Sequence, residues 1–285
     1  MNPVQRRRFR GAVNNVMLTL TGLSTLLICS LLFFVLGYLL LKGASTLDWA
    51  FFTQLPKPVG ELGGGMANAI VGSAKTLMLA TAIGVPIGFL GGVYLAEYGH
   101  KGFAFAVQYL TDLLNGVPSI VIGIFAYTLI VLRMHHFSTL AGGVALGIMM
   151  IPIAVRSTEE FLHAVPRGLR EGALALGAPK WRMLATVVVP AAKQGIITGI
   201  MLDLARVAGE TAPLLFTSFG NQFWSPGLNQ PTATLPAMIF KYATSAYADW
   251  HRQALAAGFV LLMLILTINV SARLILSRSR LSRAR

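Results

Sequence analysis

The chain has 285 residues, of which 55% are hydrophobic and only 12% are charged, and its mean hydropathy is +0.68. These values exclude an ordinary soluble domain and predict an all-α integral membrane protein. The formal net charge of +13 does not indicate nucleic-acid binding, because the cations are divided among loops and tails with no single basic face.

Six apolar windows are long enough to cross a bilayer, which requires roughly 20 mainly apolar residues per helix. The first window is longer than the apolar region of a secretory signal, so we expect it to be an uncleaved span. The six predicted transmembrane helices occupy residues 16–41, 66–95, 104–132, 139–155, 191–216 and 254–276.

The segments between the spans complete the expected organisation of the chain. When the N-terminus is placed inside, 16 of the 23 lysines and arginines fall in cytoplasmic segments, as the positive-inside rule requires. Both termini are therefore expected in the cytoplasm. The expected units are a cytoplasmic tail at 1–15, the first span with its external loop at 16–65, a membrane core at 66–276 with a polar loop at 156–190, and a basic tail at 277–285.

Motifs for catalysis and for metal or nucleotide binding are missing from the sequence. The five histidines show no HExxH spacing, the single cysteine, Cys29, lies in the first span, and no GxxxxGK[ST] stretch is present. We therefore predict no catalytic residue, no metal site and no cofactor bound by this chain. Any ATP chemistry must come from a partner.

Five ionisable side chains lie more than three residues inside the ends of predicted spans, where each is costly unless it pairs or meets water. Asp203 and Arg206 are spaced i,i+3, and Arg206 and Glu210 are spaced i,i+4, so the three can share one helix face. Such a cluster either holds helices together or lines an aqueous path, in which the Arg206 guanidinium would grip an oxyanion. The other two, Lys75 and Asp112, lie nearer span ends, where snorkelling accounts for them.

The polar loop contains the signals of a helix, a sharp turn and a second helix. Pro166 suits the start of a helix that runs to about Leu176, Gly177 suits the position just past its end, and Pro179 suits the next start. The first helix carries a short apolar ridge between polar flanks. It is either an amphipathic helix on the membrane surface or a ridge that docks into a groove on another protein.

The same loop resembles the EAA motif of ABC-importer permeases, whose pattern is EAA, three residues, G, nine residues and I-x-L-P. Here the residues are Glu171-Gly172-Ala173, Gly177 and Val187-Val188-Val189-Pro190, with intact spacing. The resemblance implies that Glu171, Gly172, Ala173, Leu174 and Gly177 couple the chain to an ATPase subunit.

Five further stretches resemble permease subunits of high-affinity phosphate importers. They are GGGMANAI from Gly63, YLAEYG from Tyr94, GVPSIVIG from Gly116, GETAPLLFT from Gly209 and NQFW from Asn221. The GETAPLLFT stretch separates one of the two phosphate permease subunits from the other and from sulfate and molybdate permeases.

The resemblance implies a type I ABC importer permease fold of the MetI-like kind, with six transmembrane helices and a cytoplasmic coupling helix. It implies that Arg206, Glu210 and Thr211 line the substrate path. Asp203, Lys75, Pro118 and Ser119 are candidates for the path or for helix pairing, although Lys75 and Asp203 belong to no motif of the family.

The implied partners are those of an importer in the bacterial cytoplasmic membrane. They are a PstC-like permease subunit in a heterodimeric pore, a PstB-like ATPase dimer that uses ATP and Mg, and a PstS-like periplasmic or lipid-anchored phosphate-binding protein. Alternatives are a permease for another oxyanion such as sulfate or molybdate, a secondary transporter that needs no ATPase, and an intramembrane enzyme, for which the spans offer no nucleophile–base pair.

Overall fold

The computed structural model describes residues 3–61, 63–99 and 102–281, and these residues are almost entirely helical. One isolated bridge joins Phe219 to Thr232. The helices, with η denoting a π-helical segment, are α1 (Pro3–Ala44), α2 (Trp49–Thr53), α3 (Ala67–Val93), η1 (Tyr94–Tyr98), α4 (Phe103–Gly116), α5 (Ser119–Ala126), η2 (Tyr127–Val131), α6 (Leu132–Met134), α7 (Thr139–His163), α8 (Arg167–Ala175), α9 (Lys180–Met183), η3 (Leu184–Val188), α10 (Val189–Ala208), α11 (Ala212–Thr217), α12 (Leu235–Ala243) and α13 (Ala248–Leu281).

Five of the described helical stretches are long and apolar enough to cross a membrane, and a bent pair brings the number to six. The prediction of a continuous third span at 104–132 is wrong, because α4 and the α5–α6 stretch meet at an angle of 105°. The break falls at Val117 and Pro118, both of which have extended ψ values. Proline disfavours helical geometry in the residue before it and lacks an amide donor, so the helix ends there.

The predicted fifth span at 191–216 is also interrupted. The spanning stretch runs from Lys180 to Ala208, where α10 ends in a turn, and α11 begins at Ala212. Pro213 lies in the first turn of α11, where its missing amide hydrogen costs nothing. The fourth span is longer than the predicted 139–155, because α7 continues to His163.

Helices α3 and α7 form the most closely packed pair in the molecule. A Cβ atom built on Gly84 would lie 2.5 Å from the Met150 Cβ, and one built on Gly92 would lie 2.5 Å from the Thr158 Cβ. Glycines four residues apart, at Gly84, Gly88 and Gly92, therefore let the two backbones approach. The two helices form one tightly packed unit.

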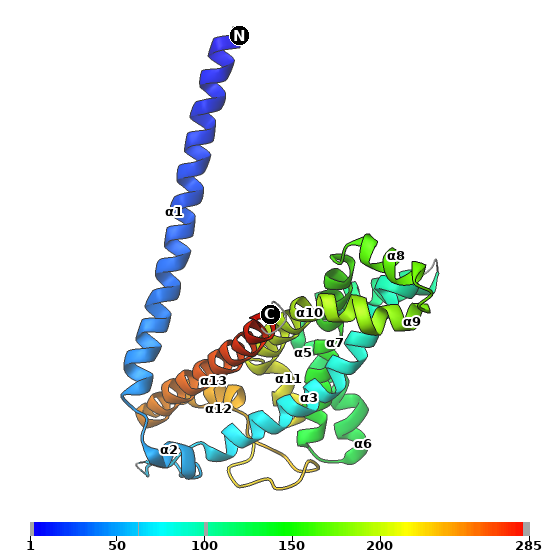
Figure 1. Ribbon diagram of the computed structural model, residues 1–285. Coiled ribbons are helices and arrows are strands. Elements are labelled where there is room, and N and C mark those ends of the chain that lie inside the picture. The colour runs from blue at the N-terminus through cyan, green and yellow to red at the C-terminus, as the bar shows by residue number, and fades with distance from the viewer. Residues whose placement is uncertain (1–2, 62, 100–101, 282–285) are drawn as a thin grey trace.

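The two ends of α3 define the two ends of the protein. Near its start, the Asn68 amide donates to the Asn221 carbonyl, 2.7 Å away, in the long segment between α11 and α12. At its other end, η1 contacts α8 and α9 (Figure 1). With 27 residues, α3 is about 40 Å long, enough to cross a bilayer. We call these the loop end and the helix-pair end, and they are far enough apart to lie on opposite sides of a bilayer.

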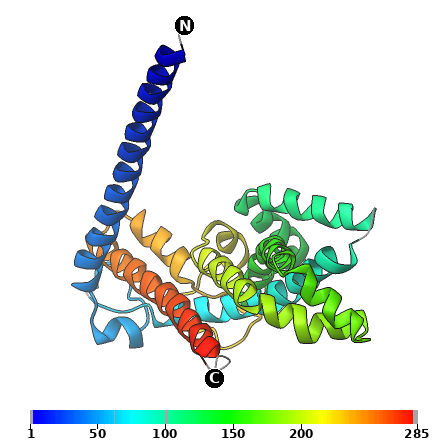
Figure 2. The ribbon, with the colours of Figure 1, turned by 45° about the horizontal axis from the view of Figure 1, so that its top comes forward.

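Helix α1 stands apart from the rest of the chain. It extends away from the other helices in both views (Figures 1 and 2), and its most apolar window buries no residue within the described chain. Near Gly43 it approaches Leu255 and Phe259 of α13. Its apolar side chains are therefore available to lipid or to another subunit.

Candidate functional site

A polar hollow of 430 Å³ lies between α4, α7 and α10. Helix α10 contributes Asp203 and Arg206, α7 contributes Arg156 and Ser157, and α4 contributes Asn115. The remaining lining residues are Ile153, Gly199 and Leu202. A cavity with two guanidinium groups in a membrane protein marks the most plausible place for an anionic ligand.

The α10 residues of this hollow have unsatisfied polar groups. Asp203 is only 2% exposed, and neither of its carboxylate oxygens has a hydrogen-bond partner within the described chain. Arg206 is exposed and makes no hydrogen bond or ion pair with another described residue. Its guanidinium donors therefore remain available to a ligand.

Arg156 pairs only loosely with a carboxylate of α4. Its Nη1 lies 3.8 Å from the Asp112 Oδ1, and the two side chains are 53% and 55% exposed. An exposed pair of this length contributes little free energy, so a ligand can replace Asp112 as the partner. The sequence analysis placed Arg156 in the cytoplasmic loop and missed it, because the predicted fourth span ended one residue earlier.

The predicted pair between Arg206 and Glu210 does not form in the structure. Helix α10 ends at Ala208, and the Glu210 amide donates to the Val207 carbonyl in the turn that follows. The i,i+4 argument fails because it needs a continuous helix. Glu210 is half-buried, and Thr211 lies at the N-cap position of α11; neither lines the hollow.

The break in the third span lies beside Arg206. Val117 lines a smaller hollow together with Arg206 and Asn115. Pro118 is the N-cap residue of α5 and Ser119 its first residue, and neither belongs to that lining. On the opposite side of α5, Gly123 lies against the backbone of Pro213, so the two short helices α5 and α11 pack together.

Lys75 has a structural contact away from the hollow. Its ammonium donates to the carbonyls of Ser225 and Pro226, at 2.7 and 3.4 Å. Together with Asn68 it fixes the segment between α11 and α12 over α3 at the loop end.

The helix pair forms where the sequence predicts it. Gly177 has a φ of +78°, its amide donates to the Leu174 carbonyl, and the Ala178 amide donates to the Ala173 carbonyl. This is a Schellman ending, which needs a left-handed residue and therefore favours glycine. Glu171, Gly172 and Leu174 are exposed and Ala173 is half-buried.

Large apolar side chains are exposed on this helix pair. Leu176 is 91% exposed and Trp181 is 65% exposed, at the tip of the turn and on α9. A surface of this kind at one end of a membrane protein suits a protein partner.

A network of ionic and polar contacts fixes the helix pair to the rest of the chain. The Arg170 guanidinium contacts the Glu97 carboxylate, with its Nε at 2.9 Å and its Nη2 at 2.8 Å from Oε1. Sequence reasoning assigned no role to either residue, although Glu97 lies in the YLAEYG stretch. The two residues are 73 positions apart, and only the fold brings them together.

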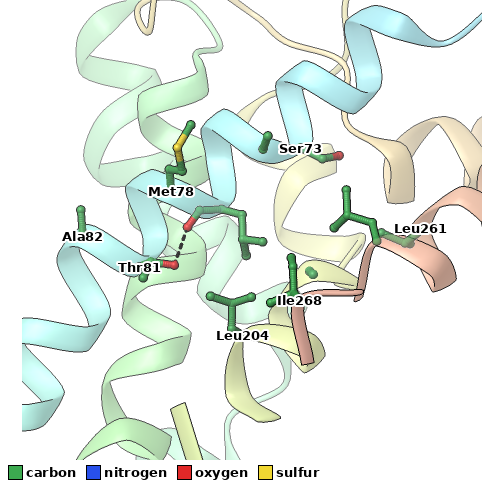
Figure 3. A pocket seen from close by; sticks show the side chains of 11 residues that line it. Ser73, Met78, Thr81, Ala82, Leu204, Leu261 and Ile268 are labelled. Carbon is green, nitrogen blue, oxygen red and sulfur yellow. Dashed lines mark hydrogen bonds between the residues drawn. The ribbon is translucent and has the colours of Figure 1, made fainter. Parts of the chain in front are cut away.

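A second cavity, of 480 Å³, lies between α3, α10 and α13 (Figure 3). Its lining is almost wholly apolar, with Met78, Leu204, Leu261 and Ile268 among the residues, and the Thr81 hydroxyl donates to the Leu77 carbonyl of its own helix. This cavity lacks the donors that an anion needs.

The architecture defines the class of protein. The chain is similar in fold to a chain of the MetNI methionine ABC transporter in an inward-facing conformation, with a TM-score of 0.59 and 18% identity over 75% of this chain and 96% of that one. A bacterial ABC transporter that imports the acidic polysaccharide alginate matches with a TM-score of 0.64 and 15% identity, over 93% and 98% of the two chains. This chain is a multi-pass membrane protein with the type I ABC importer permease fold.

The family follows from the sequence. Residues 84–281 match the family described as "Binding-protein-dependent transport system inner membrane component", and the chain belongs to this family. It is 43% identical to the phosphate transport system permease protein PstA of Yersinia pestis, over 97% of this chain and 94% of that protein. It is 33% identical to the probable phosphate transport system permease protein PstA of Methanocaldococcus jannaschii, over 96% and 97% of the two chains.

Proposed function

We propose that this chain is the permease subunit of an ATP-driven importer that carries inorganic phosphate across the bacterial cytoplasmic membrane. The observation that carries the proposal is the hollow in which Arg156 and Arg206 face one space with spare donors. Guanidinium groups bind phosphate oxygens bidentately, and the nearby carboxylates keep the anion from binding too tightly to leave. The likeness to PstA proteins selects phosphate among the oxyanions.

Transport in this proposal follows alternating access. A PstS-like protein delivers phosphate to a pore formed with a PstC-like subunit, and a PstB-like ATPase dimer supplies the driving force with ATP and Mg. This chain itself binds no cofactor and catalyses no reaction. Both termini and the helix-pair end face the cytoplasm, where closure of the ATPase dimer moves the helix pair and changes which side the hollow opens to.

Helix α8 is the proposed contact with the ATPase. Glu171, Gly172, Ala173 and Leu174 present the ridge, and Gly177 sets the turn that directs Leu176 and Trp181 outward. Helix-in-groove recognition of this kind requires the helix to be held at a fixed angle.

Substitution Gly177→Val tests this contact. Valine at a φ of +78° is strained by about 1–3 kcal/mol, so the turn should distort, and co-purification with the ATPase and phosphate-stimulated ATP hydrolysis should fall about tenfold. The matched control is Gly168→Ala, because Gly168 lies on α8 outside the ridge and a Cβ there meets nothing within 4 Å. If Gly177→Val leaves both readouts at the level of the control, the docking role is wrong.

Reconstitution of the four-component complex in vesicles tests the proposed function itself. The expected result is uptake of phosphate that requires ATP and the binding protein, with little uptake of sulfate or molybdate. Preference for another oxyanion would contradict the substrate assignment. Uptake by this chain with its permease partner alone would identify a secondary transporter instead.

A further inference from the structure

Three segments meet at the helix-pair end around the Arg170 side chain. Its Nε and Nη2 contact the Glu97 carboxylate of η1, its Nη2 also donates to the Leu162 carbonyl at 2.6 Å, and its Nη1 donates to the Val165 carbonyl at 2.5 Å. The Arg170 and Glu97 side chains are only 17% and 7% exposed. All three guanidinium nitrogens are occupied, so this arginine has no free face for a ligand.

The second helix of the pair is fixed to the same place. The Lys180 ammonium donates to the Glu97 carbonyl and lies 4.6 Å from the centre of the Tyr98 ring. Both α8 and α9 are therefore attached to η1, the last turn of the helical stretch that begins with α3. We call Arg170 and Glu97 the coupling clamp.

The clamp connects the helix pair to the wall of the polar hollow. Helix α3 is packed against α7 through Gly84 and Gly92, with no room for a side chain between the backbones. Helix α7 also carries Arg156 and Ser157, which line the hollow opposite Arg206 of α10. A displacement of α8 that reaches η1 and the end of α7 thus moves the wall of the hollow that carries Arg156 and Ser157.

We infer that Arg170 and Glu97 are positioning residues that transmit movement of the helix pair to the α3–α7 unit, so that ATP hydrolysis is coupled to translocation. Without the clamp, α8 loses its side-chain contacts with η1 and with the end of α7. It keeps the connection 164–166 and the packing of Ala173 against the cluster that includes Leu162 and Val165, so it can tilt with less movement of either helix. The inference rests on the proposed function, since it assumes that an ATPase moves α8. Arginine is required because only a planar guanidinium can donate at the same time to the Glu97 carboxylate and to the carbonyls of Leu162 and Val165.

The experiment uses the reconstituted complex and measures phosphate uptake and ATP hydrolysis in the same vesicles. The test variants are Arg170→Gln, Arg170→Lys and Glu97→Gln. Each should keep the complex assembled and hydrolysing ATP, while phosphate taken up per ATP falls about tenfold or more, the size expected when an allosteric coupling free energy is lost. The double variant Arg170→Gln/Glu97→Gln should show the same phosphate uptake per ATP as Arg170→Gln alone, because both changes remove the same contact.

The control is Arg167→Gln, an exposed arginine on the same helix with no bond to another described residue. It should keep the wild-type ratio. The inference is overturned if the clamp variants keep that ratio, or if uptake and ATP hydrolysis fall in proportion. It is also overturned if neither Arg170→Gln nor Arg170→Lys assembles, because the clamp would then serve folding alone. Phosphate uptake by the wild-type complex that does not depend on ATP would instead contradict the proposed function.

Discussion

The helix-pair end and the polar hollow both place arginine beside carboxylate, but they satisfy the arginines to different degrees. Arg170 makes four contacts of 2.5–2.9 Å in a nearly buried position. In the hollow, Arg156 reaches Asp112 only at 3.8 Å with both side chains half exposed, and Arg206, one turn from Asp203, makes no hydrogen bond or ion pair with a described residue.

The difference separates two uses of the same chemistry. A saturated guanidinium fixes the segments around it and has nothing left to offer a ligand. An unsaturated guanidinium in a hollow is the group that an anion can bind. The three predictions below test this distinction in uptake by the reconstituted complex.

The largest effect is expected for Arg206→Gln. Loss of two charge-assisted hydrogen bonds, each worth about 1.5–3 kcal/mol, should lower kcat/KM for phosphate uptake by about 100-fold or more. Arg206→Lys keeps the positive charge but lacks the planar guanidinium. Its kcat/KM should lie between those of the wild type and Arg206→Gln. Complex assembly, measured by co-purification, should be normal for both variants. Unchanged uptake in an assembled Arg206→Gln complex would remove the hollow from the proposed path.

A smaller effect is expected for Asp112→Asn. Because the pair with Arg156 is exposed and long, its removal should change the apparent KM by less than about fivefold. The apparent KM should fall, since Arg156 loses its carboxylate partner and a negative charge that repels the anion is removed. Measurement of uptake over a range of phosphate concentrations gives the KM. An effect as large as that of Arg206→Gln would mean that Asp112 acts directly on the substrate.

The smallest effect on uptake is expected for Lys75→Met. The Lys75 ammonium is occupied by the carbonyls of Ser225 and Pro226, so the KM for phosphate should stay within about twofold of wild type. Amide hydrogen exchange at residues 221–225 should instead become faster, because the segment loses its contact with Lys75 of α3. A large rise in KM with unchanged exchange would place Lys75 in the path and contradict the distinction.

Local chemistry explains what the sequence could predict. The helix pair follows from Pro166, Gly177 and Pro179, each of which acts within one turn of the chain. The apolar windows revealed the spans because bilayer thickness imposes a length on them.

The two breaks and the partners of the arginines escaped sequence reasoning for physical reasons. A hydropathy window does not reveal the bend at Val117, since the two helices on either side of it together pass as one apolar stretch. The i,i+4 spacing of Arg206 and Glu210 suggested a pair because the predicted helix continued to residue 216, whereas α10 ends at Ala208. Arg156 and Glu97 are assigned their roles by contacts between segments distant in the sequence, which no spacing rule contains.

The most direct test is whether phosphate occupies the hollow during transport. Ser157 lines it, and Cys29 is the only cysteine of the chain, so a Ser157→Cys variant in a Cys29→Ala background can be labelled selectively when the partner subunits are free of cysteine. The rate of its modification by a water-soluble thiol reagent should fall when phosphate is transported, and Arg206→Gln should abolish that protection. Equal rates with and without phosphate, in a complex that still takes up phosphate, would contradict the account.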